Sequence, residues 1–353
     1  MNKKMRLLIL TQAVDLDDPV LGFFHRWIEE FATHCGQVQV VCLKEGRHAL
    51  PPTVHVHSLG KESGASRIKY VLNFYRFMWE LRSEYDAVFV HMNPEYVVLG
   101  GWWWKLRRKR IALWYVHRQV TWRLRVAARL VDAIFTSTPE SLRLITTKAH
   151  YVGHGIDVAV YQDTPLKAID VISPRVISVG RITPIKHLET IIRALRQLRV
   201  NGILARLDFV GDPVTAQDSV YKEMLLTLVR TLQLEGIISF RGSIKNSDLP
   251  QLLAEYDFAV NAGPTGGIDK AVLESTAKGM PTFVANEGFR KYFDDLADQF
   301  IYPFGDAKEL AQRIVNFCER PDIPVVRDRL QSIAREKVSI SHLVDDMMKA
   351  IQS

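Results

Sequence analysis

Two cations that follow a short apolar run are the first candidates for chemistry. The segment VISVGRITPIKHLETIIRALRQL places Arg181 and Lys186 between a predicted strand that ends at Gly180 and a predicted helix that begins near His187. Two cations beside a helix N-terminus suit a diphosphate, because free N–H groups and the helix dipole also favour an anion there. The alternative is that both residues are ordinary surface charges on a loop.

A glycine-rich loop later in the chain is a second candidate. In NAGPTGGIDKAVLESTAKGMPTF, a predicted strand ends at Asn261, and the loop then opens a helix predicted over 270–278. The N–H groups of such a loop also favour an anion. Glu274 lies inside the helix. A carboxylate there is a poor ligand for a phosphate but could accept hydrogen bonds from the hydroxyls of a ribose. The alternative is a glycine turn followed by a solvated glutamate.

A stretch of tryptophans followed by cations, GGWWWKLRRKRIALW, stands out in the first half of the chain. Tryptophan favours the membrane interface, and each nearby cation attracts anionic lipid by roughly 1 kcal/mol. The residues expected to contact a membrane are Trp102, Trp103, Trp104, Lys105, Arg107, Arg108, Lys109 and Arg110. The alternatives are tryptophans in the core beside a solvated basic loop, or nucleic-acid binding, which the rest of the chain does not favour.

The elements that position these residues follow a repeated strand-then-helix pattern. Short apolar runs predict strands over 7–10, 38–43, 87–92, 111–116 and 133–137, and again over 176–180, 207–211, 238–242, 258–263 and 282–286. Helical segments separate many of them, and continuous apolar strands of this kind indicate parallel sheets covered on both faces. Ligands bind beyond the carboxyl ends of such strands, which is where the candidate loops lie.

The chain of 353 residues predicts two domains. We expect an N-terminal domain over 1–165, a second domain over 166–340, and a C-terminal helix over 341–353 that packs back towards the N-terminal domain. The boundary is placed near 162–174, which contains two prolines and few packing residues.

The basic charge is confined to the first half. Residues 1–165 hold 22 lysines and arginines against 15 aspartates and glutamates, a net charge of +7, and the remainder is neutral. This excess predicts an anionic partner. Three cysteines give no disulfide framework and favour a reducing compartment. We expect no membrane-spanning helix, because no run of 18 or more apolar residues occurs. We expect no secretory signal, because the first apolar run, LLIL, is short and acids follow it.

Taken together, these segments resemble the retaining family 4 glycosyltransferases of the GT-B fold, of the bacterial surface-polysaccharide type. The resemblance is carried by G-R-x-x-x-x-K at 180–186, VGD at 210–212, FRGSI at 240–244, and GGIDKAVLESTAKGMPTFVAN, which is similar to that family's E-x7-E region. It implies two Rossmann-like doubly wound α/β domains that face each other across a cleft. The first would bind acceptor and membrane, and the second would bind donor.

The resemblance also implies roles for particular residues. Arg181 and Lys186 would hold the diphosphate and take part in catalysis, together with His117 from LWYVHR, which matches an active-site histidine; His91 at a neighbouring strand end is the alternative. Glu274 matches the second glutamate of E-x7-E. Gly266 stands where the first is expected, and Asp269 could replace it. The implied donor-binding residues are Gly22, Arg181, Lys186, Arg241, Gly266, Gly267, Ile268, Asp269, Lys270 and Glu274.

The function implied is that of a metal-independent retaining hexosyltransferase without a cofactor. It would move a sugar from a nucleoside diphosphate sugar to a lipid-linked or glycolipid acceptor, as a cytoplasmic enzyme held peripherally on the inner face of the cell membrane. Its partners would be the nucleotide sugar, the acceptor and an anionic membrane surface, without nucleic acid. The alternatives are a soluble transferase with a small acceptor, and a catalytically silent GT-B scaffold, which the missing glutamate at Gly266 would favour.

Overall fold

The computed structural model describes residues 4–18, 20–117, 119–163 and 167–352. The chain divides into two compact units, one formed by residues 1–155 with 340–353 and the other by residues 156–339. The division after residue 155 lies ten residues before the predicted end of the first domain at residue 165. Residues 164–166, next to that predicted end, lie outside the described residues. The physical reason is that α5 (Val158–Gln162) packs against α9 (Lys270–Ala277) and α13 (Ile323–Lys337) of the second unit.

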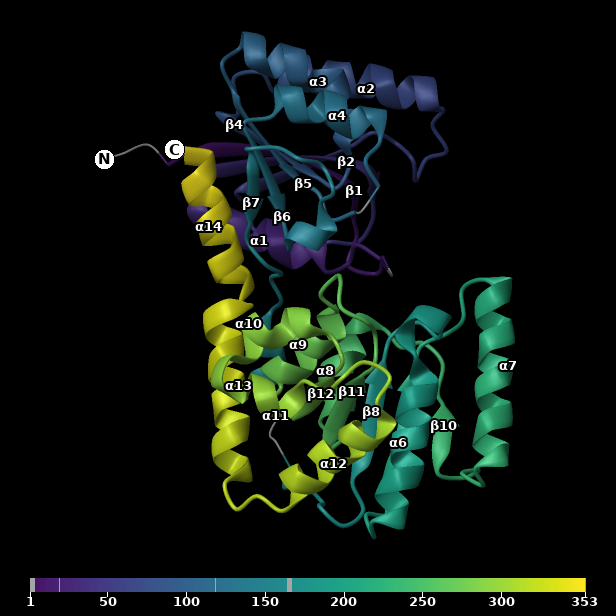
Figure 1. Cartoon of the computed structure of the whole chain (residues 1–353). Helices are drawn as coiled ribbons and strands as arrows, with labels where there is room; N and C mark the ends of the chain where they lie inside the picture. The colour runs from purple at the N-terminus through teal and green to yellow at the C-terminus, as the bar shows by residue number, and fades with distance from the viewer. Residues whose placement is uncertain (1–3, 19, 118, 164–166, 353) are drawn as a thin grey trace. The chain divides into compact units, whose positions relative to one another are not determined.

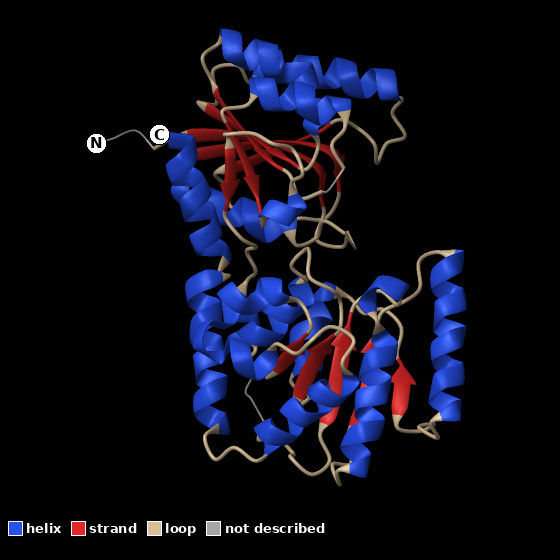
Figure 2. Ribbon diagram, in the orientation of Figure 1, coloured by secondary structure: helices blue, strands red, loops and turns tan. Residues whose placement is uncertain are grey.

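The first unit is built on a parallel sheet of seven strands in the order β3-β2-β1-β4-β5-β6-β7. Helices cover both faces of this sheet (Figure 2). The strands are β1 (Arg6–Val14), β2 (Gln37–Glu45), β3 (Val54–Ser58), β4 (Ala87–His91), β5 (Arg110–Trp114), β6 (Ala133–Thr136) and β7 (Ala149–Tyr151).

Each face of this sheet has its own apolar core, because successive side chains along a strand point to opposite faces. Leu7 and Ile9 of β1 pack on one side with α1 (Phe24–His34) and α14 (Ile340–Gln352). Leu8 and Leu10 pack on the other side with α2 (Arg67–Glu80), α3 (Pro94–Leu106) and α4 (Trp122–Leu130). Figure 1 shows these two helical layers on opposite sides of the sheet. The last helix therefore belongs to the first unit.

The second unit holds a parallel sheet of five strands in the order β10-β9-β8-β11-β12. The chain starts at the central β8 and builds outward to one edge, then returns to add β11 and β12 on the other side, so the topological switch point lies between β8 and β11. The strands are β8 (Arg175–Val179), β9 (Arg206–Val210), β10 (Ile238–Phe240), β11 (Phe258–Asn261) and β12 (Thr282–Val284).

Helices pack on both faces of this second sheet as well (Figures 1 and 2). Besides α5, α9 and α13, they are α6 (Leu188–Val200), α7 (Ala216–Thr231), α8 (Leu249–Leu253), α10 (Arg290–Phe293), α11 (Ala297–Phe300) and α12 (Ala307–Cys318). One apolar core joins them. Among the described residues, no helix is both long and apolar enough to cross a membrane.

Candidate functional site

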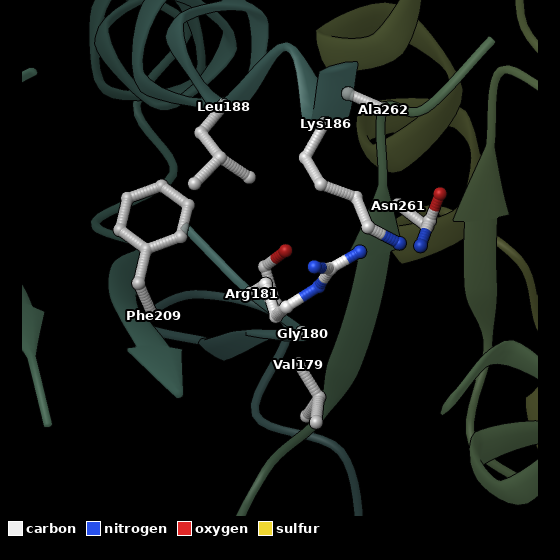
Figure 3. A pocket seen from close by; sticks show the side chains of 9 residues that line it. Val179, Gly180, Arg181, Lys186, Leu188, Phe209, Asn261 and Ala262 are labelled. Atoms are coloured by element: carbon white, nitrogen blue, oxygen red, sulfur yellow. The ribbon is translucent and has the colours of Figure 1, made fainter. Parts of the chain in front are cut away.

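A pocket opens at the switch point of the second unit, beyond the carboxyl ends of β8 and β11 (Figure 3). Its lining comes from the loop after β8, the start of α6, β9 and the end of β11. Figure 3 shows the side chains of Arg181 and Lys186 extending into the same part of this pocket, beside Asn261. The lining residues are Ser178, Val179, Gly180, Arg181, Lys186, Leu188, Phe209, Asn261 and Ala262.

Close backbone packing fixes the loop that carries Arg181. The Gly180 N–H donates to the Val210 carbonyl over 2.9 Å. A Cβ atom at Gly211 would lie 2.1 Å from the Gly180 carbonyl oxygen, so only glycine fits at that strand end. Arg181 follows as an exposed residue, and Lys186 ends a short 3₁₀ turn (Pro184–Lys186). The two predicted diphosphate ligands are thus brought to one pocket by a tightly fixed turn.

Lys186 does not stand alone in the pocket. Its Nζ atom forms an ion pair with the carboxylate of Asp269. The Asn261 side-chain amide nitrogen also donates to Asp269, over 2.7 Å, and its side-chain oxygen Oδ1 accepts from the Gly263 N–H over 3.2 Å. The pocket therefore combines a cation, a carboxylate and an amide in one hydrogen-bonded group. Asn261 was recognised in the sequence only as the end of a strand.

The glycine-rich loop leads into α9, and Asp269 is the N-cap of this helix. Its carboxylate accepts from the Ala271 N–H over 3.4 Å. The loop is held from the other side by Asn286, whose amide donates to the Gly267 carbonyl over 3.1 Å. Gly266 and Ile268 are buried, whereas Gly267 is exposed. Asp269 is therefore tied both to the helix start and to Lys186, and sequence reasoning gave no role to Asn286.

Glu274 lies one turn into α9 and is partly buried, which excludes the alternative of a solvated glutamate. Burial raises the pKa of Glu274, against the opposing effects of the Lys270 ammonium and a hydrogen bond from Tyr161. Burial likewise lowers the pKa of Lys270, which Glu274 opposes. The two residues lie one helical turn apart, with Tyr161 of α5 against the carboxylate. Tyr161 was missed in the sequence because only the fold brings α5 to α9.

Arg241 has other partners. Its guanidinium donates to the Tyr256 hydroxyl over 2.8 Å and lies 3.7 Å from the Asp208 carboxylate. The Tyr256 hydroxyl in turn donates to Asp208 over 2.5 Å. Arg241 is not among the residues that line the pocket at Arg181. These contacts explain Arg241 as part of a structural network, and the donor-binding role stays a prediction.

The remaining predicted site residues belong to the first unit. Gly22 lies in the turn before α1, where a Cβ atom would come within 2.8 Å of the Asp18 carbonyl oxygen. His117 follows β5 and is exposed, and its Nδ1 atom accepts from the Gln119 N–H over 3.0 Å. His91 is buried and stacks on Phe24 with ring centroids 3.9 Å apart. His91 is therefore a core residue, whereas the His117 side chain is exposed.

The tryptophan and arginine stretch is not a uniform surface, and the expectation that Trp104 contacts a membrane is wrong. Trp104 is fully buried, and its ring fills the space beside Gly100, where a Cβ atom would lie 2.7 Å away. Trp102 is 72% exposed on the same helix, α3. The cations Lys105 and Lys109 have partners, Lys105 in an ion pair with Asp132 and Lys109 donating to a backbone carbonyl.

The chain is similar to known glycosyltransferases. Residues 173–320 match the family described as glycosyl transferases group 1. The chain is 28% identical over 194 residues to the putative colanic acid biosynthesis glycosyltransferase WcaL of Escherichia coli K12, a match that covers 52% of this chain and 45% of that protein. The chain thus spans about half the length of the curated relatives that it matches.

Solved structures resemble the whole chain at low identity. Anabaena Alr3699/HepE in complex with UDP and glucose has a TM-score of 0.71 and 17% identity, covering 99% of this chain and 100% of that chain. A glycosyltransferase from Rickettsia africae has a TM-score of 0.72 and 11% identity, covering 100% of this chain and 98% of that one. The predicted resemblance to glycosyltransferases and the two-domain parallel-sheet α/β architecture of the GT-B fold are therefore confirmed. Retaining chemistry and the surface-polysaccharide type stay predictions.

Proposed function

We propose that this protein is a retaining glycosyltransferase that uses a nucleoside diphosphate sugar. The observation that carries the proposal is the meeting of Arg181 and Lys186 in one pocket at the switch point between β8 and β11. Two cations at such a position suit the diphosphate of a donor. The structure of HepE in complex with UDP and glucose supports the same class of donor.

The proposed transfer breaks the bond between the anomeric carbon of the sugar and the diphosphate oxygen, and forms a bond from that carbon to the acceptor oxygen. In the retaining route, the acceptor attacks from the face that the diphosphate leaves, and the departing phosphate takes the acceptor's proton. Arg181, Lys186 and the N–H groups of the loop at Gly267 would stabilise the negative charge that builds on the phosphate. This route needs no metal ion and no cofactor.

Glu274 and His117 complete the proposed assignment. Glu274 would accept hydrogen bonds from the ribose, and the Tyr161 hydroxyl and the Lys270 ammonium would hold its carboxylate in place. His117 would line the sugar near the reacting carbon. Asp269 would contact the sugar in place of the glutamate that Gly266 replaces. Each of these roles rests on the resemblance to the family together with the neighbours described above.

The proposed acceptor is a lipid-linked sugar or glycolipid at the inner face of the cell membrane, in a pathway that builds a surface polysaccharide. The name of the WcaL relative supports polysaccharide biosynthesis. The net charge of +7 in residues 1–165 supports an anionic surface or acceptor. A soluble acceptor is the competing assignment.

A panel of sugar nucleotides tests the donor. Purified protein is heated with UDP-, GDP- and ADP-sugars, and a ligand present at about 100 times its dissociation constant should add roughly 2.7 kcal/mol to stability. The stabilising donor is then used in transfer and hydrolysis assays with wild type and with Glu274→Ala, which should bind the nucleoside diphosphate about 1–3 kcal/mol less tightly. Stabilisation without turnover would favour the silent scaffold, and no stabilisation by any member would contradict the donor assignment.

A further inference from the structure

Helix α2 presents a second apolar side to solvent. Its buried side consists of Phe74, Phe77 and Met78, which pack into the core of the first unit. On the outer side, Ile68 is 75% exposed and Leu72 is 64% exposed. Together with Tyr75 and Trp79, which are also exposed, these residues recur at the spacing that places side chains on one side of a helix. The buried side already packs α2 on the core, so packing within the unit does not explain the second, exposed apolar side.

The exposed stripe continues onto α3. The Tyr75 hydroxyl donates to the Leu99 carbonyl of α3 over 3.2 Å, and the rings of Trp79 and Trp103 lie 6.1 Å apart. Figure 1 shows α2 and α3 side by side on the outer layer of the sheet. On α3, Trp102 and Leu106 are both more than 70% exposed. We call these six exposed residues the α2–α3 patch: Ile68, Leu72, Tyr75, Trp79, Trp102 and Leu106.

Such a patch is unusual on a surface. Single exposed apolar side chains are ordinary, whereas six of them on two helices whose side chains contact each other indicate an interaction site. Its composition is also informative, because tryptophan and tyrosine combine an apolar body with one polar group. This composition suits the boundary between water and hydrocarbon, where such side chains concentrate.

The charges around the patch decide what kind of partner fits. Exposed cations lie on α2 and directly after α3, and the guanidinium of Arg82, a partly buried residue just after α2, lies over the Trp79 ring at 4.4 Å. The exposed cations of these two segments are Arg67, Lys69 and Arg76 of α2 and Arg107 and Arg108 after α3. The acid on α2, Glu80, is paired with Arg76, and Asp132, which precedes β6, is paired with Lys105 of α3. An apolar stripe rimmed by net positive charge fits an anionic lipid surface.

We propose that the α2–α3 patch docks on the surface of an anionic lipid bilayer, with Trp79 and Trp102 at the level of the lipid headgroups. The inference deepens the proposed function, because it rests on an acceptor held in a membrane. It changes which residues make the contact. The contact surface now includes four residues of α2, which are Ile68, Leu72, Tyr75 and Trp79. It excludes Trp104, because that side chain lies in the core.

The test measures vesicle binding by the 353-residue chain without any sugar nucleotide, so it is independent of the proposed reaction. Vesicles contain phosphatidylcholine alone or equal parts of phosphatidylcholine and phosphatidylglycerol. Wild type should sediment with the anionic vesicles, and less so at high salt. The double variant Ile68→Gln with Leu72→Gln should bind about tenfold more weakly or worse. Both positions are exposed, so circular dichroism and the melting temperature should remain those of wild type.

A matched control exists on α7 of the other unit, where Val220 and Met224 are also exposed and spaced one helical turn apart. The double variant Val220→Gln with Met224→Gln should bind vesicles like wild type. Equal binding by both double variants and wild type would overturn the proposal. A wild-type dimer that the α2 variant converts to monomer, without vesicle binding, would assign the patch to a second copy and would also overturn it. Binding to an oligonucleotide without binding to vesicles would also overturn the proposal.

A fluorescent probe gives a direct second readout. An environment-sensitive dye on Leu72→Cys, in a background with Cys318→Ser, should shift to shorter wavelength with anionic vesicles; Cys35 and Cys42 are buried and do not compete for the dye. The same dye on Val220→Cys should not shift. An unshifted signal at position 72 under conditions where the protein sediments with vesicles would show that another surface makes the contact.

Discussion

Lys186 and Asp269 form an ion pair although they lie 83 residues apart in the sequence. One residue comes from the loop after β8 and the other from the start of α9, so the pair joins the two segments that carry the family motifs. In this structure the cation expected to hold a diphosphate already has a carboxylate partner. A bound diphosphate would therefore meet Arg181 and Lys186 together with a nearby negative charge.

Removing either cation from the pocket should impair turnover. Arg181→Ala and Lys186→Ala should each lower the transfer rate by about 100- to 1000-fold, because each variant loses a contact to the phosphate charge in the transition state. Arg196→Ala, which removes an exposed cation from α6, serves as the matched control and should keep the wild-type rate. Near-normal turnover by both pocket variants would remove these residues from the site.

Neutralising Asp269 separates its two roles. Asp269→Asn keeps an oxygen for the helix cap and removes the charge that pairs with Lys186. We expect the nucleoside diphosphate to bind more tightly, by up to about 1 kcal/mol, because the site gains net positive charge. The affinity for the complete sugar nucleotide should fall relative to the affinity for the nucleoside diphosphate. Calorimetry with both ligands measures the two effects, and equal changes would mean that Asp269 serves only the loop.

The cap itself provides the control for this experiment. Asp306 caps α12 by accepting from the Lys308 and Glu309 N–H groups over 3.0 and 2.9 Å. Asp306→Asn changes the same kind of cap elsewhere in the second unit. It should leave the affinity for both ligands unchanged.

Glu274 predicts a pH dependence of folding. Its pKa is raised from 4.5 by burial, so the folded protein binds this proton more tightly than the unfolded chain. Its contribution to stability is therefore present below about pH 4.5 and is lost as the pH rises through the raised pKa. Wild type should lose stability relative to Glu274→Gln over that range in urea unfolding. A difference that is constant with pH would contradict this, and exposed Glu235→Gln supplies the baseline.

Two tryptophans on one helix should differ sharply in their contribution to stability. Trp104→Ala should lower the free energy of unfolding by about 3–5 kcal/mol, because it leaves a large cavity beside Phe74 and Gly100. Trp102→Ala should change it by less than about 0.5 kcal/mol, since that side chain is exposed. Denaturant unfolding of both variants measures the difference. Similar losses would contradict the orientation of α3 described above.

Much of the fold could be predicted from the sequence because buried parallel strands are continuous apolar runs. All ten predicted strands are present, each within a few residues. The two missed strands, β3 and β7, are the outer strands of the seven-stranded sheet. An edge strand has one neighbour and is less covered, so VHVHS and AHY carry too few apolar residues to be recognised.

The candidate site could be predicted where spacing along the chain carries the signal, as for the meeting of Arg181 and Lys186, whereas a role for Asp269 is implied only by the resemblance to the family. It was not predictable for Asn261, Asn286 and Tyr161, because these polar residues acquire their roles only through contacts that the fold creates. The burial of one of the three tryptophans could have been predicted from their spacing. Consecutive residues on a helix point in directions about 100° apart, so three adjacent tryptophans cannot share one surface.

The packing of α14 on α1 has a consequence for how the protein is made. The first unit is discontinuous in sequence, since its last helix is synthesised only after all of residues 156–339. The side of α1 that packs on α14 therefore remains uncovered on the ribosome until residues 340–352 have been synthesised. A fragment that stops at Gly155 would keep that surface exposed. Gly155 lies against Ile340 and Leu343, so a short linker from 155 to 340 would restore the cover and release the second unit as a separate, continuous chain.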